Sequence, residues 1–512
     1  NNYIWDNVLT FTKSFKNHNL TLMAGTSFKD EGYTYLTAQG KNFPTDQEQS
    51  WYISQAVNIP AEAVSDNGLR QYGMSVFGRI AYNFKEKYLL YATLRADGSN
   101  KYQQTWGYFP TVGVGWVLTE EKFLKNNDIL PFFKIRASWG QLGNDRIQAS
   151  DGAFTTATVT TTMGGVVYGG TVVSSSYSEL KWEMTQETDI GFTAKFLKNR
   201  LSADFDYYNR DTKNAAIPVS IPLVGGSVLK PVGVIRNSGI ELAINWSQQV
   251  NEKFSYSVGV NFTTLKNQAT DLYGQPYIDG GTAEFRQRTY VGEPLMAFYG
   301  YEVDGVYQYA DTVSMKTDPI VIANKLVPGD FKYVDQNGDG KINDDDRVIL
   351  GSYFPKFMYG GDISIKFMNF DFSLSVYGQA GNKILNRKRG EIIWTSDANV
   401  DADLASNLWT PDNPTNKYPS SAGLRKGWNQ KMSDYFVENG GFFRIQNIQL
   451  GYTLKNNKWW GGNFPETRIF LTAERPLTLF KYNGFTPEVA NGWDTQTYPV
   501  AAVYTIGLNV KF

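Results

Sequence analysis

The stretch VYTIGLNVKF, residues 503–512, alternates between apolar side chains and mostly polar or small ones. A period of two places alternate residues on opposite faces of a β-strand, whereas a helix repeats every 3.6 residues or so. The stretch therefore predicts a strand whose apolar face consists of Tyr504, Ile506, Leu508, Val510 and Phe512. The last residues of a soluble chain usually fray, whereas this stretch keeps its alternation up to Phe512. The strand is therefore expected to belong to the fold and to carry a signal for closure and assembly.

The same alternation recurs along the chain. It is found in IGFTAKF (190–196), LSADFDYY (201–208), IELAINW (240–246), FSYSVGVNF (254–262), DISIKF (362–367), DFSLSVY (371–377) and NIQLGYTL (447–454). One face of each segment is apolar and the other carries Asp, Lys, Ser, Asn or Gly. No apolar run approaches the roughly 18–20 residues that a membrane helix needs. A barrel strand needs no such run, because it exposes only every second residue to lipid.

The connections between these expected strands are of two lengths. The short ones are KSFKNHN (13–19), FKEK (84–87), LKNR (197–200), SQQVNEK (247–253) and FMNF (367–370), and the long ones are 29–70, 143–180, 266–353 and 382–440. Loops longer than about 15 residues are uncommon in compact soluble domains. Short turns at one end and long loops at the other are typical of outer-membrane barrels, and aromatic residues beside the short turns are typical of a girdle at the lipid boundary.

A soluble β-sandwich or propeller also alternates, but the two loop lengths and the girdle favour an all-β, transmembrane antiparallel β-barrel. We count about fifteen strands, an odd number, whereas bacterial single-chain barrels have an even number of strands. Residues 1–512 are therefore expected to be the C-terminal portion of a larger barrel. Its first strands would come from a separate polypeptide or from a segment outside this sequence.

Composition excludes several classes of function. The formal net charge of −1 gives no indication of a nucleic-acid surface. Cysteine is absent, so disulfides and Cys-ligated zinc are excluded. His18 is the only histidine and falls in an expected short turn, which argues against a Ser-His triad and a His-ligated zinc site. The 50 acidic residues leave a pair of catalytic carboxylates open as an alternative. Most of these acids are better explained as solvated groups, and no catalytic residue is expected.

Several segments resemble the SusC/RagA family of TonB-dependent outer-membrane transporters. They are RADGSNKY (95–102), GYFPTVGVGWVLTEEKFL (107–124), KIRASWGQLGND (134–145), LKWEMTQETDIGF (180–192), NSGIELAINW (237–246), GEPLMAFYGYEVDGVYQ (292–308), FFRIQNIQLGYTL (442–454) and LFKYNGFTPEV (479–489). The resemblance runs along the whole chain in the family's order. One departure is TAERPLTLF (472–480), where the family commonly has a Gln-Asn-Leu run.

The resemblance implies energised nutrient uptake across the outer membrane of Bacteroidetes-type bacteria. It also implies a barrel of about 22 strands, an N-terminal plug, contact with TonB and a SusD-like lipoprotein lid on the long loops. The chain resembles only the last two-thirds of that barrel, so no residue is assigned to energy coupling. Oligosaccharides are the expected substrates and peptides the alternative. A surface glycan-binding β protein without transport activity is the competing class of function.

The segment DQNGDGKINDDD, residues 335–346, matches the spacing of an EF-hand-like calcium loop. Alternate oxygen atoms suit a hard cation, and Gly340 allows the sharp turn that such a loop needs. The expected ligands of a structural Ca²⁺ are Asp335, Asn337, Asp339, the Lys341 carbonyl, Asn343 and Asp346. The alternative is an acidic surface turn. The segment lies within residues 266–352, which are expected to form a long extracellular loop.

Two further sets of residues are candidates for contacts with substrate, plug or lid. Polar residues on expected strands are candidates for the wet inner wall: Arg79, Arg95, Arg136, Asp189, Asp204, Glu241 and Lys366. Aromatic residues in the expected long loops are candidates for sugar stacking, lid contact or loop cores: Tyr168, Tyr177, Trp394, Trp409 and Trp428. The sequence does not rank these alternatives.

The terminal strand generates a first prediction. If residues 503–512 carry the assembly signal, deletion of Phe512 should lower the amount of protein in the outer membrane. Immunoblots of outer-membrane fractions measure that amount. Unchanged abundance would show that Phe512 is merely one more lipid-facing aromatic.

Overall fold

The computed structural model describes residues 2–59, 64–102, 104–145, 157–163, 166–172, 181–220, 227–282, 285–386, 402–424, 426–455, 457–459, 462–494 and 497–511. Two compact units are present. One consists of Asn1–Trp116, Ala137–Glu187 and Thr212–Val232, and the other of Val117–Arg136, Thr188–Asp211 and Gly233–Phe512. Within the described ranges, every helix is too short or too polar to span a membrane.

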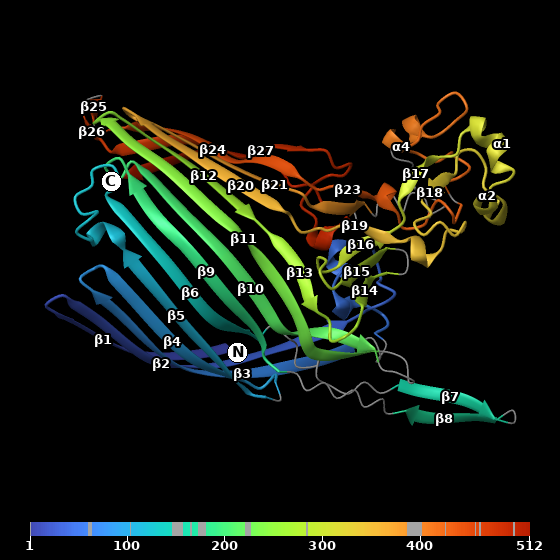
Figure 1. The fold of residues 1–512 in the computed structure, drawn as a ribbon, viewed down its shortest axis with the longest axis horizontal. Coiled ribbons are helices and arrows are strands. Elements are labelled where there is room, and N and C mark those ends of the chain that lie inside the picture. Colours follow the sequence, from blue (N-terminus) through green and yellow to red (C-terminus); the bar gives the residue numbers. More distant parts are fainter. Residues whose placement is uncertain are drawn as a thin grey trace. The chain divides into compact units, whose positions relative to one another are not determined.

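Most strands belong to one long sheet in which neighbours follow one another in chain order (Figure 1). The order is β1 (Asn2–Phe15), β2 (His18–Ala38), β3 (Val64–Phe84), β4 (Tyr88–Ser99), β5 (Trp106–Val117), β6 (Phe132–Asn144), β9 (Glu183–Phe196), β10 (Leu201–Ser220), β11 (Ser227–Asn251), β12 (Phe254–Thr264), β20 (Phe357–Phe367), β21 (Phe370–Ala380), β24 (Phe442–Leu454), β27 (Glu466–Phe480) and β29 (Val503–Lys511). With β13 (Lys266–Asp271), which pairs with β11, they form a 16-stranded sheet. The prediction of an all-β fold is confirmed, and the fifteen strands in path order agree with the predicted number.

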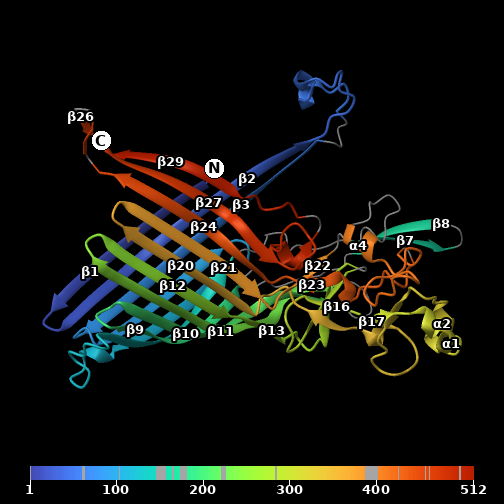
Figure 2. The ribbon, with the colours of Figure 1, turned by 90° about the horizontal axis from the view of Figure 1, so that it is seen from above.

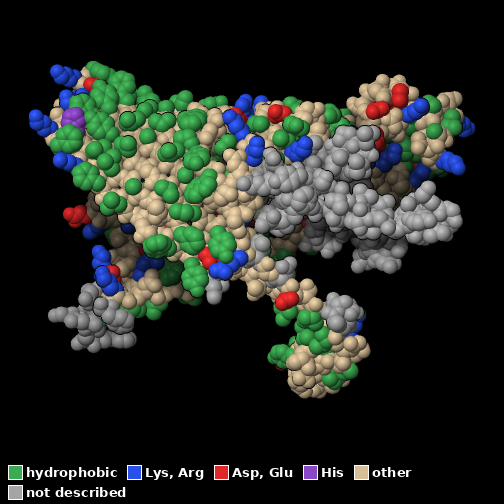
Figure 3. All heavy atoms as spheres, turned by 90° about the horizontal axis from the view of Figure 1, so that it is seen from below, with side chains coloured by type: hydrophobic (Ala, Val, Ile, Leu, Met, Phe, Trp, Pro, Cys, Tyr) green, Lys and Arg blue, Asp and Glu red, His purple; other side chains and the backbone are tan. Residues whose placement is uncertain are grey.

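The apolar face of the sheet is exposed. On β5, the side chains of Tyr108, Val112 and Val114 are exposed, whereas Phe109 on the opposite face is buried. Figure 3 shows hydrophobic side chains spread over a broad surface on which Lys, Arg, Asp and Glu are sparse. A soluble sandwich or propeller would bury such a face, because large exposed apolar surfaces mark contact with a partner or a membrane.

The strand predicted over residues 503–512 is β29, which pairs with β27 in antiparallel register. Ile506 lies opposite Leu471 and Leu508 opposite Ile469, so apolar residues of the two strands share one face. Phe512 lies outside the described residues. The predicted face of β29 is exposed at its four described positions, Tyr504, Ile506, Leu508 and Val510.

The short connections are where the sequence predicts them, and several are tighter than expected. Met368 and Asn369 alone join β20 to β21, and β11 continues to Asn251, so its turn to β12 is only residues 252–253. The prediction of a loop over residues 29–70 is partly wrong, because β2 and β3 stay paired as far as Ala38 and Val64. The expected loop 143–180 likewise contains a hairpin, β7 (Ala157–Met163) and β8 (Val166–Val172).

The two longest expected loops fold together. We call the described residues of 266–352 and 382–440 the loop module. It contains β14 (Tyr277–Gly281), β15 (Arg286–Tyr290), β16 (Ala297–Gly300), β17 (Val303–Val306), α1 (Thr312–Met315), α2 (Pro319–Asn324), β18 (Phe331–Tyr333), β19 (Val348–Gly351), β22 (Lys383–Asn386), α4 (Ala402–Asn407) and β23 (Val437–Asn439). Figures 1 and 2 show its helices at the end of the second unit's strands opposite the hairpin of β25 (Asn457–Trp459) and β26 (Gly462–Phe464).

An aromatic core holds the loop module together. Phe298 and Phe331 come from the first long segment and Phe436 from the second, and all three are fully buried in one cluster. Trp409 and Trp428 belong to the same cluster. These two tryptophans therefore form a loop core, one of the alternatives that the sequence left open, and their buried rings are not available for sugar stacking.

A buried polar network fixes the register of the two segments. Asp330 and Asn429 have no exposed surface. The Asn429 amide donates to Asp330 Oδ1 at 2.9 Å, and its Oδ1 accepts the backbone N–H of Phe331 at 2.7 Å. Lys426 forms an ion pair with the same aspartate. A buried polar group destabilises the fold unless it has a hydrogen-bond partner. In this network, residues 330–331 of the first segment and residues 426–429 of the second segment supply one another's partners.

The network predicts the effect of removing one partner. Asn429→Ala leaves the Phe331 N–H without its acceptor, and Asp330 loses a donor. We expect the free energy of local unfolding to fall by about 1–3 kcal/mol. Faster hydrogen exchange in residues 327–333 measures this loss. Asn407→Ala, at an exposed position of α4 in the same module, is the matched control and should change exchange little. Equal exchange in the two variants would contradict the prediction.

Candidate functional site

The acidic loop of residues 335–346 closes on itself through backbone hydrogen bonds. Asp335 accepts the N–H of Gly338 at 2.7 Å through Oδ1 and that of Gly340 at 2.8 Å through Oδ2. Asp346 is fully buried and accepts the N–H groups of Gln336 at 2.9 Å and Asn343 at 2.7 Å. The first and last expected ligands are thus both anchored to the backbone of the same loop.

The backbone has the conformation that the motif requires. Gly340, at the sixth position, has a φ of 75°, a region that residues with a Cβ rarely adopt. Asn337 and Asp339 each accept a backbone N–H two residues further on, at 2.9 Å. The hydrogen bond from the Gly340 N–H holds the pKa of Asp335 below its ordinary range, because it stabilises the ionised carboxylate. Other backbone donors of the loop act in the same direction, and partial burial opposes them. The carboxylate is therefore ionised at neutral pH, as a cation ligand must be.

The oxygen donors of this loop are mixed. In the described part of the chain, no three His, Cys, Asp or Glu side chains gather closely enough to hold a metal ion by themselves. A cation in this loop would need the amide oxygens of Asn337 and Asn343 and the Lys341 carbonyl beside the carboxylates. Such an all-oxygen set fits calcium better than a transition metal.

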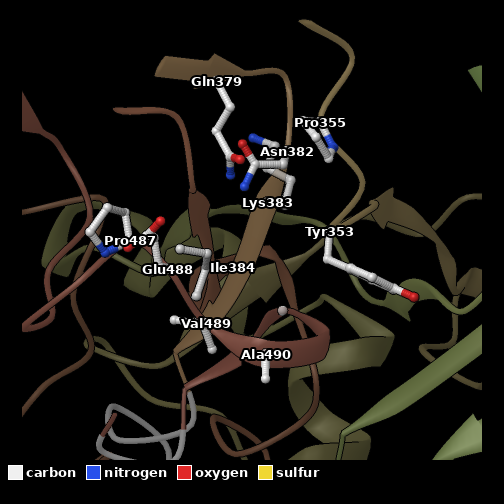
Figure 4. A pocket seen from close by; sticks show the side chains of 11 residues that line it. Tyr353, Pro355, Gln379, Asn382, Lys383, Ile384, Pro487, Glu488, Val489 and Ala490 are labelled. Carbon is white, nitrogen blue, oxygen red and sulfur yellow. The ribbon is translucent and has the colours of Figure 1, made fainter. Parts of the chain in front are cut away.

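A cavity of about 400 Å³ lies where the strands of the second unit meet the loops (Figure 4). Strand β21 ends at it, β22 begins beside it, and the segment before β28 (Trp493–Asp494) forms another wall. Its lining residues are Tyr353, Pro355, Gln379, Asn382, Lys383, Ile384, Pro487, Glu488, Val489, Ala490 and Gly492. Figure 4 shows Gln379 and Asn382 converging on one side and the Tyr353 hydroxyl pointing away.

An ion pair fixes one wall of this cavity. Arg444 of β24, which is 7% exposed, donates to both oxygens of Glu488, at 2.7 and 2.9 Å. This two-point geometry orients the carboxylate and neutralises its charge. Behind it, β22 pairs in parallel with β28, Leu385 opposite Trp493, and so ties the loop module to the segment that carries Glu488.

Polar strand residues pair with one another on the face opposite the exposed apolar residues. Arg136 donates to Thr193 Oγ1 at 2.6 Å and forms an ion pair with Asp206, and the Thr193 hydroxyl donates to Asp204 at 2.7 Å. Arg95 donates to Asp97 at 2.7 Å. These wall residues mainly satisfy one another.

The other predicted wall residues do not form one site. Arg79 lies over the ring of Tyr91, 5.9 Å from its centroid. Asp189, Glu241 and Lys366 lie on three different strands, β9, β11 and β20. Within the described ranges, the predicted wall residues are spread over the sheet and do not surround a single ligand.

The predicted loop aromatics have different outcomes. Tyr168 lies on β8, whose course alone is described, and Tyr177 and Trp394 lie outside the described residues. Sequence reasoning missed Asn382, Lys383 and the Arg444–Glu488 pair. Their segments are far apart in the chain, and no local spacing marks them.

Comparison with known proteins identifies the fold. The family model described as "TonB dependent receptor-like, beta-barrel" matches residues 1–312. TonB-dependent receptor P3 of Formosa agariphila is 30% identical over 100% of this chain and 52% of its own length. TonB-dependent receptor SusC of Bacteroides thetaiotaomicron is 29% identical over 86% of this chain and 44% of its own length.

The structural comparison agrees. A chain in "Structure of the RagAB peptide transporter" matches 99% of this chain and 55% of its own length, with a TM-score of 0.80 and 21% identity. Likeness at this identity concerns the fold alone. The chain spans about half the length of the curated relatives it matches.

Proposed function

This chain belongs to the TonB-dependent receptor-like β-barrel family, and we propose that the protein imports a nutrient across the outer membrane as a SusC/RagA-type transporter. Membership of the family places the protein in the outer membrane. The single observation that carries the proposal is the 16-stranded antiparallel sheet with an exposed apolar face. That face suits lipid, while the paired polar groups opposite it suit a wet interior.

Oligosaccharides are the substrates that this chemistry favours. The charged strand residues Arg136 and Arg95 are neutralised by carboxylates, and the chain as a whole has a formal net charge of −1. A passage with little net charge suits an uncharged ligand bound by hydrogen bonds. Peptides are the second candidate, because the structurally similar RagAB is a peptide transporter.

The loop module is the proposed seat of a SusD-like lipoprotein lid on the extracellular side. Four apolar side chains around α1 and α2 are strongly exposed: Tyr309, Val313, Ile322 and Val327. Apolar patches on a rigid, cored segment are typical of protein contact sites. Energy from TonB is also part of the proposal, but no residue of this chain is assigned to contact TonB.

Genetics and purification test the transport proposal and the lid. Loss of the gene should abolish growth on at least one oligosaccharide while growth on its monosaccharides continues. The protein extracted in mild detergent should co-purify with a lipoprotein. Val313→Glu together with Ile322→Glu should reduce that lipoprotein at least tenfold by placing charges in an apolar contact.

Gln249→Glu, at an exposed position of β11 near its short turn, adds a charge elsewhere and serves as the control. It should leave the lipoprotein in place. Normal growth of the deletion strain on every glycan and peptide would refute transport. A protein that purifies alone would refute the lid.

We propose in addition that residues 335–346 bind a structural calcium ion. The proposal is supported by the sequence spacing, the φ of Gly340 and the fully buried Asp346. The residues that would hold the ion are Asp335, Asn337, Asp339, the Lys341 carbonyl, Asn343 and Asp346. Bound calcium would stiffen this part of the loop module and take no part in chemistry.

Calcium should therefore slow hydrogen exchange in residues 335–346. The effect should be complete at a calcium concentration of about 1 mM, within the range of extracellular calcium modules. Chelation should reverse the protection, and Asp339→Ala should abolish it. Asp345→Ala removes an exposed carboxylate at a position that supplies no ligand and should retain the response. Protection that is independent of calcium, or lost equally in both variants, would contradict the proposal.

A further inference from the structure

We propose that the cavity between β21, β22 and residues 487–492 binds one sugar unit of a neutral oligosaccharide. This inference rests on the proposed function and assigns a place to its substrate. The cavity holds about 400 Å³, within the range of small-ligand sites. Its walls combine amide, ammonium and carboxylate groups with apolar side chains (Figure 4).

An unsatisfied amide is the first argument. Asn382 lines the cavity and is only 4% exposed, and its Oδ1 is buried without a hydrogen-bond partner in the described structure. Most buried side-chain polar atoms have a partner, and an orphaned acceptor is destabilising. The atom itself has almost no accessible surface, so the side chain would have to turn toward the cavity, where a ligand hydroxyl would supply the missing donor.

Donors lie beside this acceptor. Lys383 lines the cavity and brings an ammonium group. Gly351 leaves room for the Lys383 side chain, because a Cβ at residue 351 would lie 2.7 Å from Lys383 Cγ. The Tyr377 hydroxyl donates to Gln379 Oε1 at 3.4 Å. The oxygen of the Gln379 amide is thus engaged, and the amide nitrogen is the donor that this side chain can offer to a ligand.

The opposite wall offers an acceptor of reduced charge. Both oxygens of Glu488 accept from Arg444, yet each keeps a further lone pair, and the side chain is 38% exposed. Pro355, Pro487 and Ile384 add apolar surface. Donors, acceptors and apolar patches are the groups that the hydroxyl edges and C–H faces of a sugar ring need from a binding site.

The C-terminal end of a peptide fits the same walls less well. Its terminal carboxylate could reach Lys383, but it would also face two acceptors, Asn382 Oδ1 and the Glu488 carboxylate. A carboxylate cannot donate to either of them. A sugar hydroxyl both donates and accepts, so neighbouring hydroxyls can satisfy Lys383 and Asn382 together.

Binding to the purified protein in detergent tests the inference. The probes are maltose, cellobiose and lactose, titrated by calorimetry and saturation-transfer NMR, with glycylglycine as the peptide probe. At least one disaccharide should bind, and Asn382→Leu and Lys383→Met should each weaken it at least tenfold. Asn382→Asp, which keeps an oxygen acceptor, should bind within a few-fold of the native protein.

Lys253→Met, an exposed lysine in the short turn between β11 and β12, is the matched control and should bind normally. If Asn382→Leu fails to fold, Lys383→Met alone decides. No binding of any disaccharide, or equal binding by Lys383→Met and the control, overturns the inference. Glycylglycine binding that is lost in Lys383→Met overturns the assignment to sugars.

These outcomes are separate from failure of transport. If gene loss abolishes growth on an oligosaccharide but Asn382→Leu and Lys383→Met bind its units normally, transport stands and this cavity is refuted. If the cavity binds sugar but gene loss leaves growth on every glycan unchanged, the proposed function is refuted.

Discussion

Every backbone N–H and C=O group inside a lipid bilayer must find its partner within the protein. Strand pairing in chain order meets this constraint, and β2 and β3 meet it residue for residue from His18 to Ala38. The constraint also dictates the turns. A connection as short as Met368 and Asn369 leaves few unpaired backbone groups where two strands meet. Irregular segments are therefore displaced to the ends of the strands, which is where the loop module lies in its unit.

Segments displaced from the sheet lose its hydrogen-bond ladder and need another source of stability. The loop module obtains it by burying aromatic side chains from two segments that are far apart in the chain, such as Phe331 and Phe436. Hydrophobic burial is not directional, so it does not by itself fix which residues meet. The paired Asp330 and Asn429 supply that specificity, because a shift of either segment would leave buried polar groups without partners.

Local patterns made much of the fold predictable. The period of two marked β29 and its neighbours, and the spacing from Asp335 to Asp346 marked a closed loop with a left-handed glycine. Predictions failed where the outcome depended on distant contacts. Residues 29–70 were expected to be a loop, but polar β-formers such as Thr34 continue the pairing. Trp409 and Trp428 remained ambiguous, because only the folded module shows that their partners lie in another segment.

The arrangement of charges follows from the same constraint. On the polar face of the strands, Arg136 pairs with Asp206, Arg236 with Asp211 and Arg468 with Asp371. Paired charges hold their own side chains in place and leave little net field to attract a charged ligand. In the proposed transporter, discrimination between ligands would then depend on polar groups that the protein does not satisfy itself. In the second unit, Asn382 is such a group, and it lies where the strands end and the loop module begins.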